Sequence, residues 1–148
     1  MSDKGYEYTY DIPEGYVEID PSHYEDLGLT GMVKETTLNF FVKAVNDQVV
    51  STLSVNRDAF VDEENTYDSL MELNFTNLKQ NGFEVSNIVE ITRNDGSRLT
   101  KCHVTNKRFK LVSMFTCIGT LFVGSSILAS DNNSEAVLEK FMKSIKVK

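Results

Sequence analysis

The sequence predicts an α+β fold, in which an antiparallel sheet of about six to seven strands is sandwiched between helices as an α/β/α arrangement. Apolar residues alternate with period two in several segments that short turns connect, and strands connected in this way are antiparallel. One uncharged stretch would be apolar on both faces of a sheet, so it requires cover on both sides. The chain of 148 residues fits a single globular domain, 1–148, which is long enough to bury a core.

The uncharged stretch covers residues 111–130, between Lys110 and Asp131. As a helix it would be long enough to cross a bilayer, and basic residues precede it as on a cytoplasmic flank. Its many β-branched and aromatic residues favour strands instead, and its hydroxyl groups reduce any gain from insertion into lipid. The hydroxyl residues are Ser113, Thr116, Thr120, Ser125, Ser126 and Ser130. We therefore expect a buried hairpin with its turn at Gly119 and no integral membrane segment.

The other strands are expected at residues 7–10, 16–19, 36–45, 49–55, 83–92 and 98–105, with a short last strand at 145–148. Asn46 and Asp47 form the turn of one hairpin, and residues 94–97 form another turn. Residues 20–31 are polar and lack periodicity, so we expect a surface loop carrying His23. Residues 57–64 are expected to be an acidic connection. In the strand at 83–92, four residues should face inward: Phe83, Val85, Val89 and Ile91.

Two segments have the helical spacing of apolar residues. The first is expected to start at Asn65 or Thr66 as the N-cap and to continue to about residue 81, where Gly82 ends it. The second should start at Asn132, Asn133 or Ser134 and place an apolar stripe on one face. With one helix on each side, the two-faced hairpin would be covered.

The formal net charge is −7, with −13 over residues 1–92 and +6 over residues 93–148. An acidic total argues against nucleic-acid binding, because phosphate contacts need a concentrated basic surface. We interpret the asymmetry as attraction between opposite halves within the fold. Basic residues accompany two turns, and we expect both turns to be solvated. These residues are Arg93 and Arg98 at one turn, and Lys107, Arg108 and Lys110 at the next.

The cysteines Cys102 and Cys117 are expected to be buried free thiols, since a disulfide would need a shift of strand register. The predicted register places Cys102 opposite about Ser113. Cys102 and His103 are adjacent on a strand, so they point to opposite faces and form no catalytic dyad. No spacing of His, Cys and acidic residues supplies convergent metal ligands, and no glycine-rich phosphate loop is present. We expect no catalytic residues, no metal and no cofactor.

Tyrosines concentrate in the N-terminal part of the chain, at Tyr6, Tyr8, Tyr10, Tyr16 and Tyr24. A tyrosine suits a site where one end is apolar and the other is wet. These residues form a candidate binding rim. The alternative is that they cap the edge of the sheet, which would bury the first three against the closing helix.

Three segments resemble the PsbP/Mog1-like superfamily, and in particular its bacterial members of unknown role. They are Asp-Ile-Pro-Glu-Gly-Tyr at 11–16, Gly-Phe-Glu-Val at 82–85, and Leu-Glu-Lys-Phe-Met-Lys-Ser-Ile at 138–145. The family often has Trp after the Pro-x-Gly turn, where this chain has Tyr16. The resemblance implies an antiparallel sheet between helices. It also implies a class whose members are mostly non-catalytic. These members include photosystem accessory subunits, a partner of a small nuclear GTPase, and bacterial proteins that are often secreted or lipid-anchored.

We therefore expect a non-enzymatic binding or accessory module that engages a protein partner through loops and one sheet edge. The alternative is a carrier of a small apolar ligand held between sheet and helix. Its cavity would be lined by Phe40, Phe41, Phe75, Phe83, Phe115 and Phe122. The N-terminus has no basic region followed by an apolar core, so no signal peptide is expected. A cytoplasmic protein and a mature or trimmed extracytoplasmic domain both fit this, and the oligomeric state stays open.

Overall fold

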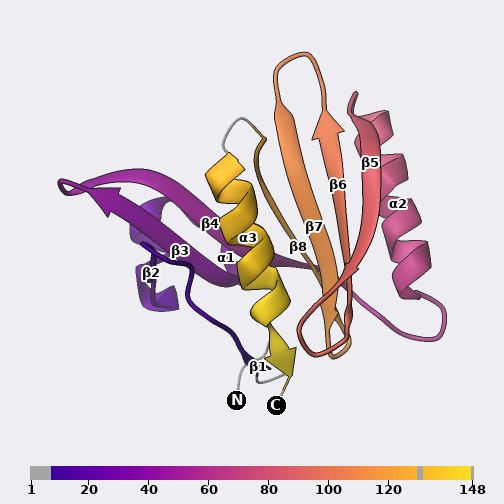
Figure 1. Ribbon diagram of the computed structural model, residues 1–148, viewed down its shortest axis with the longest axis horizontal. Coiled ribbons are helices and arrows are strands. Elements are labelled where there is room, and N and C mark those ends of the chain that lie inside the picture. Colours follow the sequence, from indigo (N-terminus) through magenta and orange to yellow (C-terminus); the bar gives the residue numbers. More distant parts are fainter. Residues whose placement is uncertain (1–7, 130–131, 148) are drawn as a thin grey trace.

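A computed structural model describes residues 8–129 and 132–147 of the chain (Figure 1). Its centre is a seven-stranded antiparallel sheet with the order β2-β3-β4-β8-β7-β6-β5. The strands are β2 (Val17–Glu18), β3 (Thr37–Val45), β4 (Gln48–Phe60), β5 (Glu84–Thr92), β6 (Arg98–Thr105), β7 (Lys110–Ile118) and β8 (Leu121–Leu128). A separate ribbon pairs β1 (Tyr8–Thr9) with β9 (Lys146–Val147), the short last strand. The predicted fold class and strand number are confirmed.

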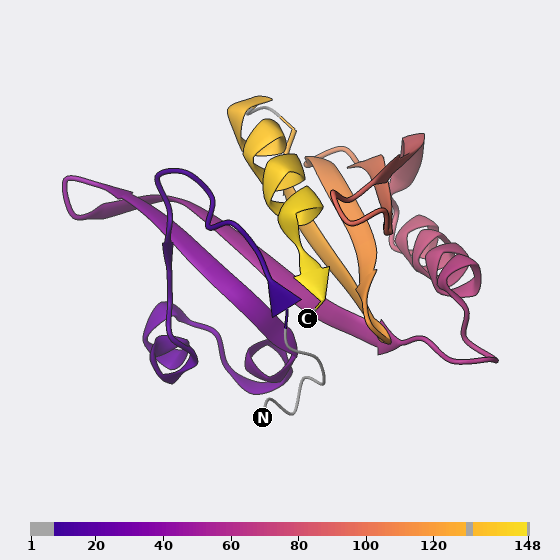
Figure 2. The same ribbon diagram turned by 60° about the horizontal axis from the view of Figure 1, so that its bottom comes forward.

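One long helix covers each face of the sheet (Figures 1 and 2). Helix α2 (Tyr67–Gln80) buries Leu70 against one face, and helix α3 (Asn132–Ser144) buries Phe141 against the other. Thr66 caps α2, because its Oγ1 accepts a hydrogen bond from the Ser69 amide at 3.2 Å. The helix ends at Gly82, whose φ of 87° is the left-handed conformation that terminates many helices. Both predicted helices are confirmed.

Strands β7 and β8 form the hairpin predicted for residues 111–130, with Ile118 opposite Leu121 across the turn at Gly119. Met114 faces α3 while Phe115 faces α2, so both faces of the hairpin are buried as expected. Ser130 lies outside the described residues. Among the helices that the structure describes, none combines the length and the apolar character needed to span a bilayer.

The loop expected at residues 20–31 is partly wrong. It contains two 3₁₀ turns, η1 (Pro21–His23) and η2 (Glu25–Leu27), followed by the short helix α1 (Gly31–Thr36). Asp20 starts η1, because its Oδ1 accepts a hydrogen bond from the Ser22 amide at 2.9 Å. Tyr24, between the two turns, is 1% exposed and packs its ring edge-on to Phe40. Single turns are too short to show a helical period, which explains the difference.

The acidic connection expected at residues 57–64 is also partly wrong, because β4 continues to Phe60. Arg57 pairs with Val123 and Phe60 pairs with Leu121. A register shift between Arg57 and Ala59 leaves Asp58 at a bulge, and this extra residue breaks the alternation that marks a strand. At the other end of the sheet, β5 has a similar shift between Ser86 and Val89. Val89 is 44% exposed there, so its expected inward orientation is wrong.

The sheet divides at β4 into two diverging branches, and we call this point the fork. Among the described residues, only 56–60 of β4 pair with β8, whereas residues 48–49 and 51–55 pair with β3 alone and Val50 lies at a register shift. Residues 125–128 of β8 pair with β7 alone. The β3–β4 hairpin therefore diverges from the rest of the sheet and projects from the molecule, as Figures 1 and 2 show. Helix α3 joins the two branches on one face, where Phe141 contacts Phe41 of β3 edge-on, with ring centroids 5.0 Å apart.

Candidate functional site

The described tyrosines of the candidate rim have structural contacts. Tyr16 is 8% exposed and Tyr24 is 1% exposed, so both lie in the core. Tyr10 is half-buried against Phe141 of α3, and its hydroxyl donates to Glu18 Oε1 at 2.5 Å. The hydroxyl of half-buried Tyr8 donates to Asn39 Oδ1 at 2.6 Å. Burial raises the pKa of the Tyr8 and Tyr10 hydroxyls, which keeps them neutral donors.

These contacts match the alternative in which the tyrosines support the sheet and the closing helix. Tyr6 lies outside the described residues. A binding rim built on the tyrosines remains a prediction.

The first basic turn is not solvated, contrary to expectation. The Arg93 side chain is 1% exposed, and it forms an ion pair with Asp95, Nη2 to Oδ2, at 2.9 Å. Its Nη1 also donates to the Cys117 carbonyl at 2.6 Å and to Thr116 Oγ1 at 3.2 Å. The Arg93 guanidinium lowers the pKa of Asp95 to about 2. Arg93 therefore anchors the turn between β5 and β6 to the end of β7.

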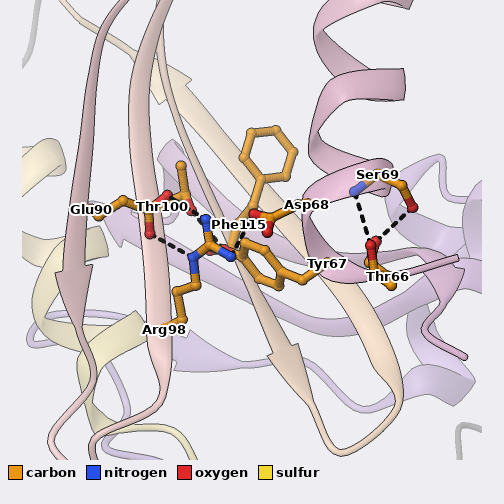
Figure 3. A network of polar contacts seen from close by, with 8 residues as sticks. All are labelled: Thr66, Tyr67, Asp68, Ser69, Glu90, Arg98, Thr100 and Phe115. Atoms are coloured by element: carbon orange, nitrogen blue, oxygen red, sulfur yellow. Dashed lines mark hydrogen bonds and ion pairs between the residues drawn. The ribbon is translucent and has the colours of Figure 1, made fainter. Parts of the chain in front are cut away.

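Arg98 likewise belongs to a network rather than to a free basic tip (Figure 3). It forms ion pairs with Glu90, Nε to Oε2 at 2.8 Å, and with Asp68, Nη1 to Oδ1 at 2.7 Å. The Arg98 guanidinium lowers the pKa of Glu90. Thr100 Oγ1 donates to Glu90 Oε1 at 2.8 Å, which completes the contacts of this carboxylate. The network connects the start of α2 to β5 and β6, so its role is structural.

The second basic turn matches its expectation of a solvated turn. Lys107, Arg108 and Lys110 are exposed, and no ion pair joins them to other described residues. Phe109 lies among them with 48% of its surface exposed. This tip is the basic part of the surface at the end of β6 and β7.

Both cysteines are free thiols, as predicted. Cys102 lies opposite Ser113, which is the register expected from the sequence. Burial raises the pKa of each thiol to about 11, so both are protonated at neutral pH and are poor nucleophiles. His103 is bound through Nδ1 to Asn87 Nδ2 at 2.9 Å, away from the thiols of the core.

The sequence did not reveal a polar groove that opens at the fork of the sheet, on the face that carries α2. The groove has a volume of ≈350 Å³. It is lined by Ser54, Asn56, Asp58, Asn74, Leu78, Phe83, Val104, Leu111, Ser113, Phe115, Gly124, Ser125 and Ser126. Gly124 forms part of its floor, where an added Cβ would lie 3.0 Å from the Phe115 ring and 3.2 Å from Asp58 Oδ2. A side chain at position 124 would therefore crowd Phe115 and Asp58.

Asp58 is the charged group of the groove. Its carboxylate has no hydrogen-bond or ion-pair partner among the described residues, and the residue is exposed. The surrounding protein raises the pKa of Asp58 to about 6 by desolvation. Arg57, its neighbour in the chain, instead places its guanidinium over the Phe60 ring, 4.8 Å from the centroid. The groove therefore holds one negative charge above pH 6 with no cation beside it.

A second candidate surface is the arm, defined as residues 43–50 of the β3–β4 hairpin. All eight residues are exposed, and three of them are valines: Val45, Val49 and Val50 are 51%, 55% and 57% exposed. The turn residues Asn46 and Asp47 both have positive φ, 53° and 63°, which gives a tight two-residue hairpin turn. Within the part of the chain that the structure describes, β3 is the one strand that pairs with residues 48–55 of β4.

The six phenylalanines of the alternative function do not line one cavity. Phe40 packs with Tyr24, and Phe41 packs on the α3 side of the sheet. The other four lie on the α2 side: Phe75, Phe83, Phe115 and Phe122. Only Phe83 and Phe115 of this set reach the groove, where polar groups form much of the lining.

Comparison with known proteins identifies the fold. No model of a protein family matches the sequence, and no curated protein matches it either. The architecture, a seven-stranded antiparallel sheet between two helices, is PsbP-like. The solution structure of cyanobacterial PsbP (CyanoP) from Synechocystis is similar over 100% of this chain and 89% of that protein. The TM-score is 0.60 and the sequence identity is 12%, so the likeness defines the fold.

Proposed function

We propose that this protein is a non-enzymatic binding or accessory module that engages a protein partner through the arm and the free edge of β4. The observation that carries the proposal is the combination of exposed valines on the arm with an unpaired strand edge next to them. Exposed apolar side chains on an unpaired strand edge favour association with another chain. A free edge can bind an extended segment of another chain by adding it as a further strand.

The chemistry of the partner follows from that of the arm. Lys43 and Asp47 are the charged residues of the arm, so the surface is nearly neutral and apolar. An extended segment that places β-branched or aromatic side chains on the valines would bury apolar surface and satisfy the backbone groups of β4. The neutral thiols Cys102 and Cys117 support a role without nucleophilic catalysis.

The test replaces Val49 and Val50 with lysine, since lysine on an edge strand prevents pairing with another strand. A photo-crosslinking amino acid at Val45 of the otherwise unchanged protein first captures the partner in native cells, and mass spectrometry identifies the crosslinked segment. A synthetic peptide with that segment is then titrated against the purified protein. We expect V49K/V50K to weaken peptide binding by at least about tenfold, because each lost apolar contact costs roughly 1 kcal/mol or more.

The matched control carries Leu73→Lys and Ile88→Lys, two side chains that are 55% and 52% exposed on α2 and β5. This control should bind the peptide like the unchanged protein. Equal binding by V49K/V50K, or an equal loss in the control, would contradict the proposal.

A further inference from the structure

The groove at the fork presents more hydrogen-bond acceptors than free donors. Asp58 contributes two carboxylate oxygens that have no partner among the described residues. Asn74 of α2 donates its amide nitrogen to the Leu70 carbonyl at 3.3 Å, which leaves its side-chain oxygen as an acceptor. The Ser113 and Ser126 hydroxyls are bonded to each other at 2.7 Å, and their oxygens keep lone pairs for a further donor.

Most donors of the side chains that line the groove already have partners. Ser54 Oγ donates to Asn56 Oδ1 at 3.1 Å, and Asn56 Nδ2 donates to Thr37 Oγ1 at 3.0 Å. Ser125 Oγ donates to the Ser54 carbonyl at 2.6 Å. Asn56, Asn74 and the Ser113–Ser126 pair each keep one hydrogen. The two unpartnered oxygens of Asp58 nevertheless favour a ligand that supplies donors itself.

The charge and shape of the groove restrict the ligand further. Asp58 is the sole titratable side chain among the residues that line it, since β6, β7, β8 and α2 contribute apolar groups, hydroxyls and one amide. A cation is thus favoured and an anion is disfavoured. Leu78, Phe83 and Phe115 supply apolar wall, and a volume of ≈350 Å³ is that of a small-molecule site.

We propose that this groove binds an alkylammonium group, which pairs with Asp58 while its short carbon chain packs on Phe83 and Phe115. A primary ammonium has three donors and no acceptor, which matches the excess of acceptors. An ion pair that is also hydrogen-bonded is stronger than a neutral hydrogen bond. The proposal does not depend on the arm, which lies on the free branch of the fork.

The experiment titrates n-butylammonium chloride into ¹⁵N-labelled protein at pH 7.5 and follows the amide resonances of Gly124, Ser126 and the Asn74 side chain. We expect saturable shifts at these groups and weaker binding at pH 5, where Asp58 is protonated. Butan-1-ol, which has the same chain without the charge, should give no saturable shift below about 50 mM. The absence of saturable shifts with butylammonium, or equal shifts with the alcohol, would overturn the proposal.

Two variants locate the site. Asp58→Asn keeps the shape of the side chain and removes its charge, so binding should weaken by at least about tenfold. Asn74→Leu removes an acceptor and narrows the groove from the helix side, so it should also weaken binding. Asp47→Asn makes the same charge change at the tip of the arm and should bind like the unchanged protein. Equal binding by D58N and D47N would overturn the proposal.

A further titration distinguishes two sources of the ammonium group. Lysine capped as N-acetyl and N-methylamide carries the same butylammonium chain on a peptide backbone. Tighter binding of the free amine supports a small-molecule ligand, and tighter binding of the capped lysine supports a lysine side chain of another protein. Both results support ammonium recognition, whereas failure of both ligands to bind would overturn it without affecting the proposal for the arm.

Discussion

The guanidinium of Arg98 lies over the ring of Tyr67, with its carbon 4.3 Å from the ring centroid. Tyr67 is the first residue of α2 and Arg98 is the first residue of β6, so this contact joins the start of the helix to the sheet. Burial raises the pKa of Tyr67 to about 12, so its hydroxyl remains a donor. The hydroxyl donates to the Phe115 carbonyl at 2.9 Å and lies 2.7 Å from Thr100 Oγ1.

Tyr67→Phe should lower the free energy of unfolding by about 1–2 kcal/mol, because it leaves the partly buried Phe115 carbonyl without its donor. The ring would still pack on Phe122 and under Arg98. Urea denaturation measures the change. Tyr16→Phe is the control, since it removes one hydroxyl contact to Ser51 and should cost less. A cost for Tyr67→Phe no larger than that for Tyr16→Phe would contradict this account.

Arg93→Met should destabilise the fold by about 3 kcal/mol, because it removes one partner of a buried ion pair and leaves Asp95 without its cation. The carbonyl of Cys117 would also lose its donor. Arg98→Met, at a site that is 45% exposed, should cost about 1 kcal/mol or less. Denaturation curves of the two variants compare the effects directly. Equal costs would show that burial does not distinguish these arginines.

Asp58 should make stability fall as pH rises from about 4 to about 6. Its pKa is raised from 3.8 to about 6 in the fold, so the folded protein binds more protons than the unfolded chain in this window. Desolvation in the folded protein disfavours the charged carboxylate of Asp58. Asp58→Asn should therefore flatten this part of the pH profile and, given the partial exposure of the group, raise stability at pH 7 by up to about 1 kcal/mol. Melting temperatures measured from pH 4 to 8 provide the comparison, and a profile unchanged in D58N would argue against desolvation at this site.

Cys102 and Cys117 should react slowly with a thiol reagent in the native protein. A pKa of about 11, against 9.0 for an unperturbed thiol, leaves about a hundredfold less thiolate at pH 8. The expected result is slow release of the chromophore from Ellman's reagent by the folded protein and rapid release in guanidinium chloride. Rapid reaction of one thiol equivalent in the native protein would contradict this expectation. Loss of that rapid reaction in a Cys117→Ser variant would show that Cys117 is the accessible thiol.

The central hairpin and both helices could be predicted because their apolar residues follow one period without interruption. Residues 111–118 alternate between the two faces, and the faces require one helix each. The extension of β4 could not be predicted in this way, since the bulge at Asp58 inserts an extra residue and shifts the alternation. Arg93 was also misplaced, because its burial depends on the carbonyl of Cys117 and the carboxylate of Asp95 meeting it from different elements.

The groove was missed for a related reason. Ser54 and Asp58 come from β4, Ser113 comes from β7 and Asn74 comes from α2, so their proximity follows from the strand order β4-β8-β7 and from the position of α2. One local signal was present. Ser113 and Ser126 are hydroxyl residues that lie opposite each other in the hairpin and face the same side. From the sequence, these hydroxyls served only as an argument against a membrane helix. As a polar stripe on one face of the hairpin, they indicate where α2 does not cover the sheet.

The small ribbon of β1 and β9 brings the first and last described strands of the chain together. Tyr8 lies opposite Val147, so the first and last described strands are neighbours although the whole chain separates them. A short linker between these strands could make the chain circular, and new ends could then be opened at Asn46 and Asp47 in the exposed turn of the arm. Such a circular permutant would keep the strand order and both helix layers. The order in which the chain is synthesised is therefore separable from the architecture that it adopts.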